Sequence, residues 1–186
     1  MSRITVVQPK EAVSPLKEVY EEIIQKRGGL SEVLKIQSLH PQSIRSHLAF
    51  YMDVMFAHTT LSRAEKEMIA VVVSSANGCR YCQEHHGAAL QTYWKATDRV
   101  YALKKDFETA GLTEKEKSLC RYAVTLTRQP ANHEATDHTK DLRLAGCSDA
   151  AILDASLVTS YFNFVNRMVL SLGVQLEAHA GEGYTY

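Results

Sequence analysis

Residues 61–86 read LSRAEKEMIAVVVSSANGCRYCQEHH, and this stretch decides the fold of the chain. It begins with a capping-box sequence at residues 62–65 and continues through a long apolar run. Asn77 and Gly78 then form a helix-stopping signal, and a Cys-x-x-Cys pair follows at once. We therefore predict two consecutive helices, with the cysteines at the start of the second and the other helices holding them in place.

The spacing of the cysteines and histidines predicts a shared helix face. Residues three or four apart on a helix lie on one side, so Cys79, Cys82 and His86 can form one stripe. We expect the neighbouring His85 to face solvent. Free N–H groups in the first turn of a helix favour an anion, and a Cys-x-x-Cys arrangement lowers a thiol pKa from roughly 8.5. Because the thiolate is the reactive form, we predict that Cys79 and Cys82 form a redox dithiol.

A carboxylate upstream is the next candidate for chemistry. Glu65 completes the capping box with Ser62, which leaves Glu67 as the freer acidic residue. Residues 71–73 are three valines, which favour β-strands, but the capping box favours a helix. Because this helix is apolar around most of its circumference, we expect it to be buried. A buried glutamate needs a partner, and a carboxylate can orient a histidine that accepts a thiol proton. The alternative is that Glu67 lies at a surface end of the helix and stabilises the helix dipole.

Four interpretations of the Cys-x-x-Cys pair compete with a redox dithiol. A zinc site could use the pair with His86, although structural zinc usually takes four ligands from two separated pairs, and Cys120 and Cys147 are single. Covalent haem attachment is excluded, because Gln83 stands where the histidine would be. A thioredoxin-like motif would lie in a βαβ setting, whereas the flanks here predict helices. Two unreactive buried cysteines also stay possible.

Composition narrows the class of protein. The 186 residues contain 21 Lys plus Arg and 21 Asp plus Glu, so the net charge is zero. This argues against nucleic acid or an anionic membrane as the main partner and tolerates self-association. The N-terminus lacks the long apolar region of a signal peptide, and no stretch reaches the roughly 18 apolar residues of a membrane span. Four cysteines without an export signal then indicate a reduced, cytoplasmic protein.

The rest of the chain also predicts helices, so we expect an all-α, single-domain bundle over residues 1–186. Its core would span about 41–176, with 1–14 and 180–186 peripheral. The other expected helices cover residues 15–27, a short one from Ser31 through Leu39, a longer one opened by Ser43, one from Thr97, and three at 113–128, 136–145 and 148–172.

A second stretch repeats the opening pattern faintly. Thr113 and Glu116 form another capping box, and a later Gly-Cys pair ends at Cys147. This copy lacks the Cys-x-x-Cys pair and the histidine, so we expect it to be structural, with Cys120 as a small core residue. A group of charged and imidazole side chains follows, and we interpret it as a solvated face rather than a metal cluster. It consists of His133, Glu134, Asp137 and His138.

The pattern Glu67, Cys79-x-x-Cys82, His86 resembles the alkylhydroperoxidase D-like (AhpD-like) proteins of the carboxymuconolactone decarboxylase superfamily. In that family a glutamate lies 12 residues before the first cysteine and a histidine four after the second, as in this chain. Residues 162–167, FNFVNR, also look like the peroxidase-related branch. Some members place a histidine before the second cysteine, where this chain has Tyr81. At that position this chain therefore has a phenol in place of an imidazole.

The resemblance implies a helical oligomer, a trimer or hexamer, that reduces small hydroperoxides without a cofactor. Cys82 would attack the peroxide, His86 and Glu67 would relay its proton, and Cys79 would resolve the sulfenic acid to a disulfide. A lipoylated or thioredoxin-like dithiol protein would then reduce the pair. The residues alone leave the order of the cysteines open, because Cys79 lies nearer the helix N-terminus. A zinc-stabilised helical module and a cofactorless decarboxylase of the related branch remain the alternatives.

Overall fold

The structure is a computed structural model and describes residues 2–177. All regular elements within this range are helices, which confirms the predicted all-α class. In chain order they are α1 (Leu16–Arg27), α2 (Glu32–Lys35), α3 (Pro41–Phe56), α4 (Arg63–Ala76), α5 (Arg80–Trp94), α6 (Thr97–Lys105), the 3₁₀ turn η1 (Phe107–Thr109), α7 (Glu114–Arg128), α8 (Asn132–Ala135), α9 (Thr139–Leu144) and α10 (Asp149–Leu172).

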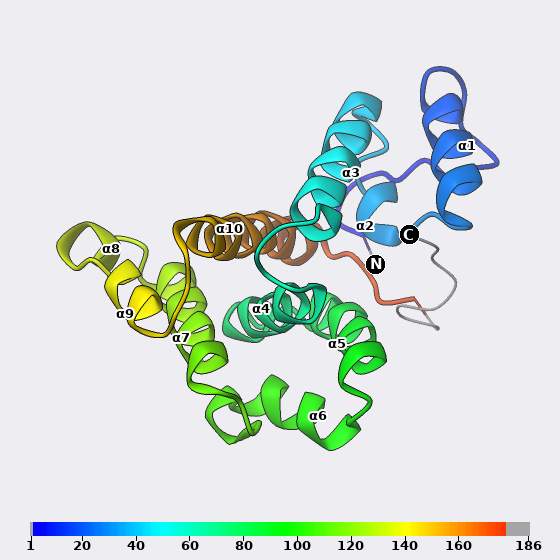
Figure 1. The fold of residues 1–186 in the computed structure, drawn as a ribbon. Coiled ribbons are helices and arrows are strands. Elements are labelled where there is room, and N and C mark those ends of the chain that lie inside the picture. The colour runs from blue at the N-terminus through cyan, green and yellow to red at the C-terminus, as the bar shows by residue number, and fades with distance from the viewer. Residues whose placement is uncertain (1, 178–186) are drawn as a thin grey trace.

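Helix α4 lies in the middle of the bundle, with α5, α6, α7 and α10 packed around it (Figure 1). Residues 66–74 of this helix are all buried, including the three valines. Burial on every side explains why these β-branched residues adopt a helix, since tertiary packing overrides their weak intrinsic preference. The predicted capping box is present: the Ser62 hydroxyl accepts from the Glu65 N–H at 3.2 Å, and Glu65 accepts from the Ser62 N–H at 2.8 Å.

A tight turn joins α4 to α5 and places the cysteines. Gly78 has a φ of +68°, a left-handed conformation that favours glycine, and Cys79 is the N-cap of α5. The Cys79 N–H donates to the Ser74 carbonyl at 2.8 Å, which closes the turn. The Asn77 side chain donates to Asn166 of α10 at 3.0 Å. The predicted position of the cysteines in the first turn of a new helix is therefore confirmed, and that turn is bound to α10.

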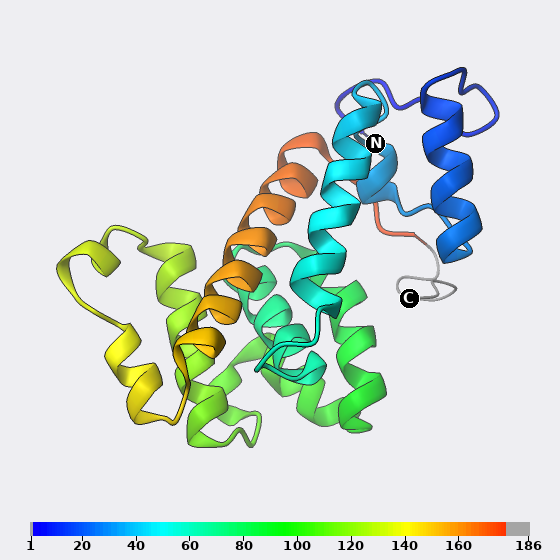
Figure 2. The same cartoon turned by 45° about the horizontal axis from the view of Figure 1, so that its top comes forward.

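Helices α3 and α10 run side by side along one flank of α4, and α1 with α2 lies beyond α3 (Figure 2). A second apolar cluster fills the space beneath α1, with Val19, Tyr20 and Ile44 fully or almost fully buried. The N-terminal segment is tied to the end of α10, since the Arg3 N–H donates to the Leu172 carbonyl at 2.9 Å. Within residues 2–177, no helix combines the length and apolarity needed to cross a membrane.

Three predicted helix boundaries were wrong. Helix α2 ends at Lys35 rather than Leu39, and α3 begins at Pro41 rather than Ser43, because proline is well suited to the first helical position. Helix α9 begins at Thr139 instead of 136; residues 136–138 form a turn in which the Asp137 carboxylate accepts from the Thr139 N–H at 3.1 Å. The other predicted helices are confirmed, whereas the predicted peripheral tail at 180–186 lies outside the described residues.

Candidate active site

A cavity of about 90 Å³ lies where α3, α4, α5 and α10 meet the α1–α2 region. Its wall combines aromatic and aliphatic side chains with polar groups, which is typical of a small-molecule site. Cys82 is part of this wall, whereas Cys79 is not among the residues that line it. Its polar side chains belong to Arg27, Ser31, His47, Tyr51, Arg63, Tyr81, Cys82, His85, His86 and Tyr161.

Glu67 of α4 joins this cavity through His86. Its side chain is fully buried, with Oε2 2.7 Å from His86 Nδ1 and Oε1 2.6 Å from Arg63 Nη2. Burial raises the pKa of Glu67, but His86 and Arg63 together outweigh burial and hold the pKa below its usual range. An ionised carboxylate only accepts hydrogen bonds, so Nδ1 of His86 carries a hydrogen. In the neutral ring, Nε2 is then left as a base.

Both cysteines are free thiols and are buried. A hydrogen bond from the Cys82 thiol lowers the pKa of Cys79 against the effect of burial, and the N–H groups of Cys82 and Tyr81 add to this lowering. The same hydrogen bond and burial raise the pKa of Cys82, while a hydrogen bond from Asn166 opposes the rise. The lower thiol pKa therefore belongs to Cys79, whereas access to the cavity belongs to Cys82.

Asn166 is a site residue that sequence reasoning did not assign. It is fully buried on α10, its amide donates to the Ser74 hydroxyl at 3.2 Å, and it also hydrogen-bonds Cys82. Its carbonyl oxygen accepts from Asn77 at 3.0 Å. The signal was present, because Asn166 belongs to residues 162–167 that resemble the peroxidase-related branch.

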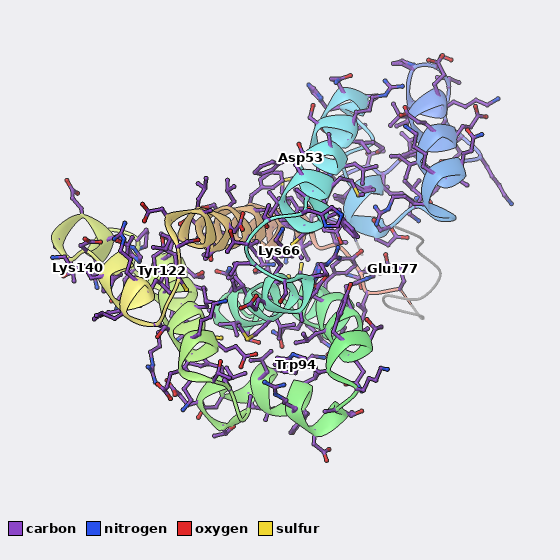
Figure 3. The ribbon with its side chains drawn as sticks, viewed as in Figure 1. Asp53, Lys66, Trp94, Tyr122, Lys140 and Glu177 are labelled. Carbon is purple, nitrogen blue, oxygen red and sulfur yellow. The ribbon has the colours of Figure 1, made fainter. Side chains whose placement is uncertain are left out.

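The prediction that His85 faces solvent was wrong. Its side chain is only 12% exposed, and Nε2 lies 2.8 Å from Oε2 of Glu177. The Tyr81 hydroxyl donates to the other oxygen of Glu177 at 2.9 Å, and the Glu32 N–H donates to the same oxygen at 2.8 Å. Burial raises the pKa of Glu177, but His85 and the backbone N–H groups lower it to about 2. The segment after α10 is therefore fastened beside α5 (Figure 3).

Tyr81 consequently has a different role from a member of the Glu67 relay. Its hydroxyl is engaged by Glu177, and its ring packs 4.4 Å from the His85 ring. The hydroxyl also accepts from the Val33 N–H at 3.4 Å. Tyr81 thus connects α5 to the C-terminal segment, and it also lines the cavity together with Cys82 and His86.

Within residues 2–177, no group of three or more His, Cys, Asp or Glu side chains is arranged to hold a metal ion. Cys120 is fully buried in the core, as expected. The residues of the second candidate cluster are spread over a surface loop and two short helices, with Glu134 and Asp137 exposed. His133 and His138 pack ring against ring at 4.6 Å.

The comparison with known proteins agrees with this fold. The family model described as the carboxymuconolactone decarboxylase family matches residues 41–103, which run from α3 to α6. An AhpD-core, peroxidase-related protein from Ralstonia eutropha JMP134 superposes with a TM-score of 0.84 at 25% identity, covering 97% of this chain and 94% of that one. A peroxidase-related protein from Silicibacter sp. TM1040 gives a TM-score of 0.82 at 29% identity, covering 98% of both chains.

A further solved structure shares the fold at lower identity. It is the C82A variant of the debrominase Bmp8 in complex with 2,3,4-tribromopyrrole, with a TM-score of 0.76 at 22% identity over 96% of this chain and 95% of that one. The fold and site therefore define an all-α protein of the AhpD class. Residues 41–103 match the carboxymuconolactone decarboxylase family model, and the whole chain is similar in fold to an AhpD-core protein and a peroxidase-related protein, which supports a place in the AhpD-like group.

Proposed function

We propose that this protein is a thiol peroxidase that reduces small hydroperoxides through the Cys79–Cys82 pair. One observation carries the proposal: Cys82 and His86 line the same cavity, and the fully buried, ionised Glu67 holds His86 by its Nδ1 at 2.7 Å. A nucleophile, a base and a residue that orients the base are thereby assembled beside one cavity. The similarity to AhpD-like proteins supports the same reading.

The atoms and electrons of this reaction balance with the residues of the protein and two substrates, which are the hydroperoxide and a dithiol reductant. Nε2 of His86 takes the proton of the Cys82 thiol, and the thiolate attacks the outer oxygen of R–O–O–H. The O–O bond breaks, Cys82 becomes a sulfenic acid, and the alkoxide takes up a proton to leave as R–OH. The Cys79 thiol then displaces water from the sulfenic sulfur and forms the Cys79–Cys82 disulfide. A dithiol protein, lipoylated or thioredoxin-like, reduces this disulfide and becomes oxidised in turn.

The order of the two cysteines follows from access rather than from pKa. Cys79 has the lower thiol pKa, but Cys82 lines the cavity and Cys79 does not. A Cys79 thiolate is well placed to attack the Cys82 sulfur once that sulfur is oxidised, because the two thiols are already hydrogen-bonded. We therefore assign Cys82 as the peroxide-reactive residue and Cys79 as the resolving residue.

The test is peptide mapping of the fully reduced protein after about one equivalent of cumene hydroperoxide or hydrogen peroxide. We expect a Cys79–Cys82 disulfide within seconds, while Cys120 and Cys147 remain free thiols. Four unreacted thiols would refute the peroxidase reading. A second step adds reduced lipoamide or reduced thioredoxin to the oxidised protein and follows the return of the two thiols, which identifies the class of reductant.

A second candidate is reductive debromination of a small aromatic ring. The walls of the cavity include the rings of Tyr51, Tyr161 and Phe162, which suit a flat aromatic molecule. The Cys82 thiolate would take bromine from the ring while the ring carbon gains a proton, and the Cys79 thiol would then displace bromide from the Cys82 sulfur, lose its proton and close the disulfide. Incubating the reduced protein with 2,3,4-tribromopyrrole and measuring bromide release tests this candidate. Bromide release faster than peroxide consumption would favour it over the peroxidase.

The quaternary structure belongs to the proposal as well. The similarity to AhpD-like proteins supports a homo-oligomer, a trimer or a hexamer, in the cytoplasm. Sedimentation equilibrium of the reduced protein measures the subunit number directly. A monomer at micromolar concentration would contradict this part of the proposal without affecting the chemistry of the dithiol.

A further inference from the structure

The cavity wall also carries a second series of hydrogen-bonded polar side chains, which the reaction above does not use. His47 of α3 is buried between Gln37 and Tyr161, and both His47 and Tyr161 line the cavity with Cys82. The distances are 2.7 Å from His47 Nδ1 to Gln37 Nε2 and 2.8 Å from His47 Nε2 to the Tyr161 hydroxyl. Sequence reasoning did not single out any of these three residues.

The donor and the acceptor can be assigned for each hydrogen bond that links Gln37, His47 and Tyr161. Nε2 of Gln37 also lies 2.9 Å from the Val33 carbonyl, an acceptor, so this atom is the amide nitrogen and donates. Its other hydrogen points at His47 Nδ1, which must therefore accept. Burial, with a smaller contribution from Arg27, lowers the pKa of His47 to about 4, so the ring is neutral near pH 7. Its one hydrogen is on Nε2 and is donated to the oxygen of Tyr161.

Because the Tyr161 oxygen accepts from His47, the phenol acts as a donor through its own hydrogen. An O–H whose oxygen already accepts a hydrogen bond is also a stronger donor, since hydrogen bonds in a chain polarise one another. Tyr161 lines the same cavity as Cys82 and His86, and the Phe162 ring lies between the Tyr161 and His86 rings in a series of ring contacts. Tyr161 and Phe162 are consecutive on α10 with rings 5.1 Å apart, and Phe162 packs 4.5 Å from the His86 ring.

We propose that Tyr161 is a catalytic residue that donates a hydrogen bond to the leaving oxygen of the hydroperoxide, and that His47 and Gln37 are its positioning residues. This inference rests on the proposed peroxidase function. The site then has two sides. Glu67 and His86 remove the proton from the Cys82 thiol, and Tyr161 stabilises the alkoxide that forms as the O–O bond breaks. The alkoxide is finally protonated by the hydrogen that His86 took from the thiol.

The role predicts a dependence on the leaving group, which a purely structural role would not produce. tert-Butyl hydroperoxide releases a strongly basic alkoxide that needs a donor, whereas peracetic acid releases acetate, which needs none. In a Tyr161→Phe variant we expect sulfenylation of Cys82 by tert-butyl hydroperoxide to slow by about 10²-fold, the size seen when one oxyanion donor is removed. The rate with peracetic acid should change less than about threefold, and so should alkylation of Cys82 by iodoacetamide.

Matched variants separate the possible outcomes. Tyr122→Phe removes a buried phenol of α7 whose hydroxyl lies 2.7 Å from the Ser156 hydroxyl of α10. Tyr122 lies at the other end of the bundle from Glu177 (Figure 3), so this variant should leave both peroxide rates unchanged. His47→Phe should reproduce the selective loss, and His47→Gln, whose amide can still donate to Tyr161, should retain more of the rate. Equal losses with both peroxides in Tyr161→Phe would overturn the inference and leave the peroxidase intact. A wild-type protein that reacts with neither peroxide would instead refute the proposed function.

Discussion

Two parts of this molecule begin alike and end with different cysteine chemistry. Helices α4 and α7 each begin with a capping box, with the N-cap N–H 2.8 Å from the glutamate in both and the glutamate N–H 3.2 Å from the N-cap oxygen in both. Each part later has a left-handed glycine followed by a cysteine, at Gly78 with φ +68° and at Gly146 with φ +86°. The two parts are joined directly, since Lys115 Nζ lies 2.7 Å from Glu65.

The two cysteines differ by one residue in their position relative to the start of the next helix. Cys79 is itself the N-cap of α5, so the free N–H groups of Tyr81 and Cys82 lower its pKa. Cys147 precedes Ser148, and it is the Ser148 hydroxyl that caps α10 by accepting from the Ala151 N–H at 3.2 Å. The pKa of Cys147 is raised, mainly because the thiol is buried. The caps build the same local structure twice, and the side chains around each cysteine decide whether it is a reactive thiol.

Replacing one cysteine in each part gives the largest expected contrast. Cys82→Ser should lower peroxide turnover by on the order of 10³-fold or more, because the nucleophile is lost. Cys120→Ser should leave turnover within about twofold, since burial raises the pKa of this thiol and it lies outside the cavity wall. Steady-state consumption of cumene hydroperoxide with a dithiol reductant measures both variants. Comparable losses in the two would contradict the separation of the parts.

The position that corresponds to Glu67 in the second part is Ser118, which allows a matched pair of substitutions. Glu67→Gln should cost about 3 kcal/mol of unfolding free energy, because Arg63 is left without a buried counter-charge, and should slow sulfenylation by about 10²-fold. Ser118→Ala should change both quantities little. Urea unfolding and stopped-flow sulfenylation measure the two effects.

The cost of Glu67→Gln should also depend on pH. The pKa of Glu67 is depressed in the folded protein, so its charge stabilises the fold above the unfolded-state pKa of about 4.3. This contribution is lost as the pH falls through the folded-state pKa. Wild type and variant should therefore converge in stability in acid, below about pH 4, and differ fully at pH 7. A difference that stays constant from pH 7 to pH 3 would refute an ionised Glu67.

Glu177 provides a contrast between a half-buried and an exposed ion pair. Its pKa of about 2 lies below the unfolded value, so its stabilisation is complete above about pH 4.3 and is lost as the pH falls toward 2. Glu177→Gln should cost roughly 2 kcal/mol at pH 7 after solvent screening is discounted. Glu108→Gln breaks the exposed pair with Arg121 of α7 and should lower the unfolding free energy far less, because solvent screens this pair. Urea unfolding at pH 7 distinguishes the two, and equal costs would contradict the picture.

Sequence patterns predicted the helices and the main group of candidate catalytic residues, because these depend on short-range spacing. The capping boxes, the Asn77–Gly78 stop and the interval from Cys79 to His86 all lie within a few turns of one another. The Glu67–His86 contact across two helices was reached through family resemblance as well as through spacing. Short-range patterns thus located α4, α5 and the residues on them.

The rest of the site could not be predicted from spacing, because it comes from distant parts of the chain. His47 meets Tyr161, which is 114 residues away, and His85 meets Glu177, which is 92 residues away. A lone polar residue on an apolar helix face carries no sign of its partner. Only the packing of α3 and the C-terminal segment against α5 and α10 shows which of these residues face the cavity.

The smallest expected effect tests whether the two capping boxes are equivalent. Ser62→Ala and Thr113→Ala each remove an oxygen that accepts from a glutamate N–H at 3.2 Å, so each should cost about 1 kcal/mol of unfolding free energy. The two losses should agree within about 0.5 kcal/mol and add in the double variant, because the side chains lie on different helices. Urea unfolding measures all three variants. A much larger loss for Ser62→Ala would mean that the first cap also holds Glu67 and the cavity in place, and the likeness of the two parts would then be limited to their sequence.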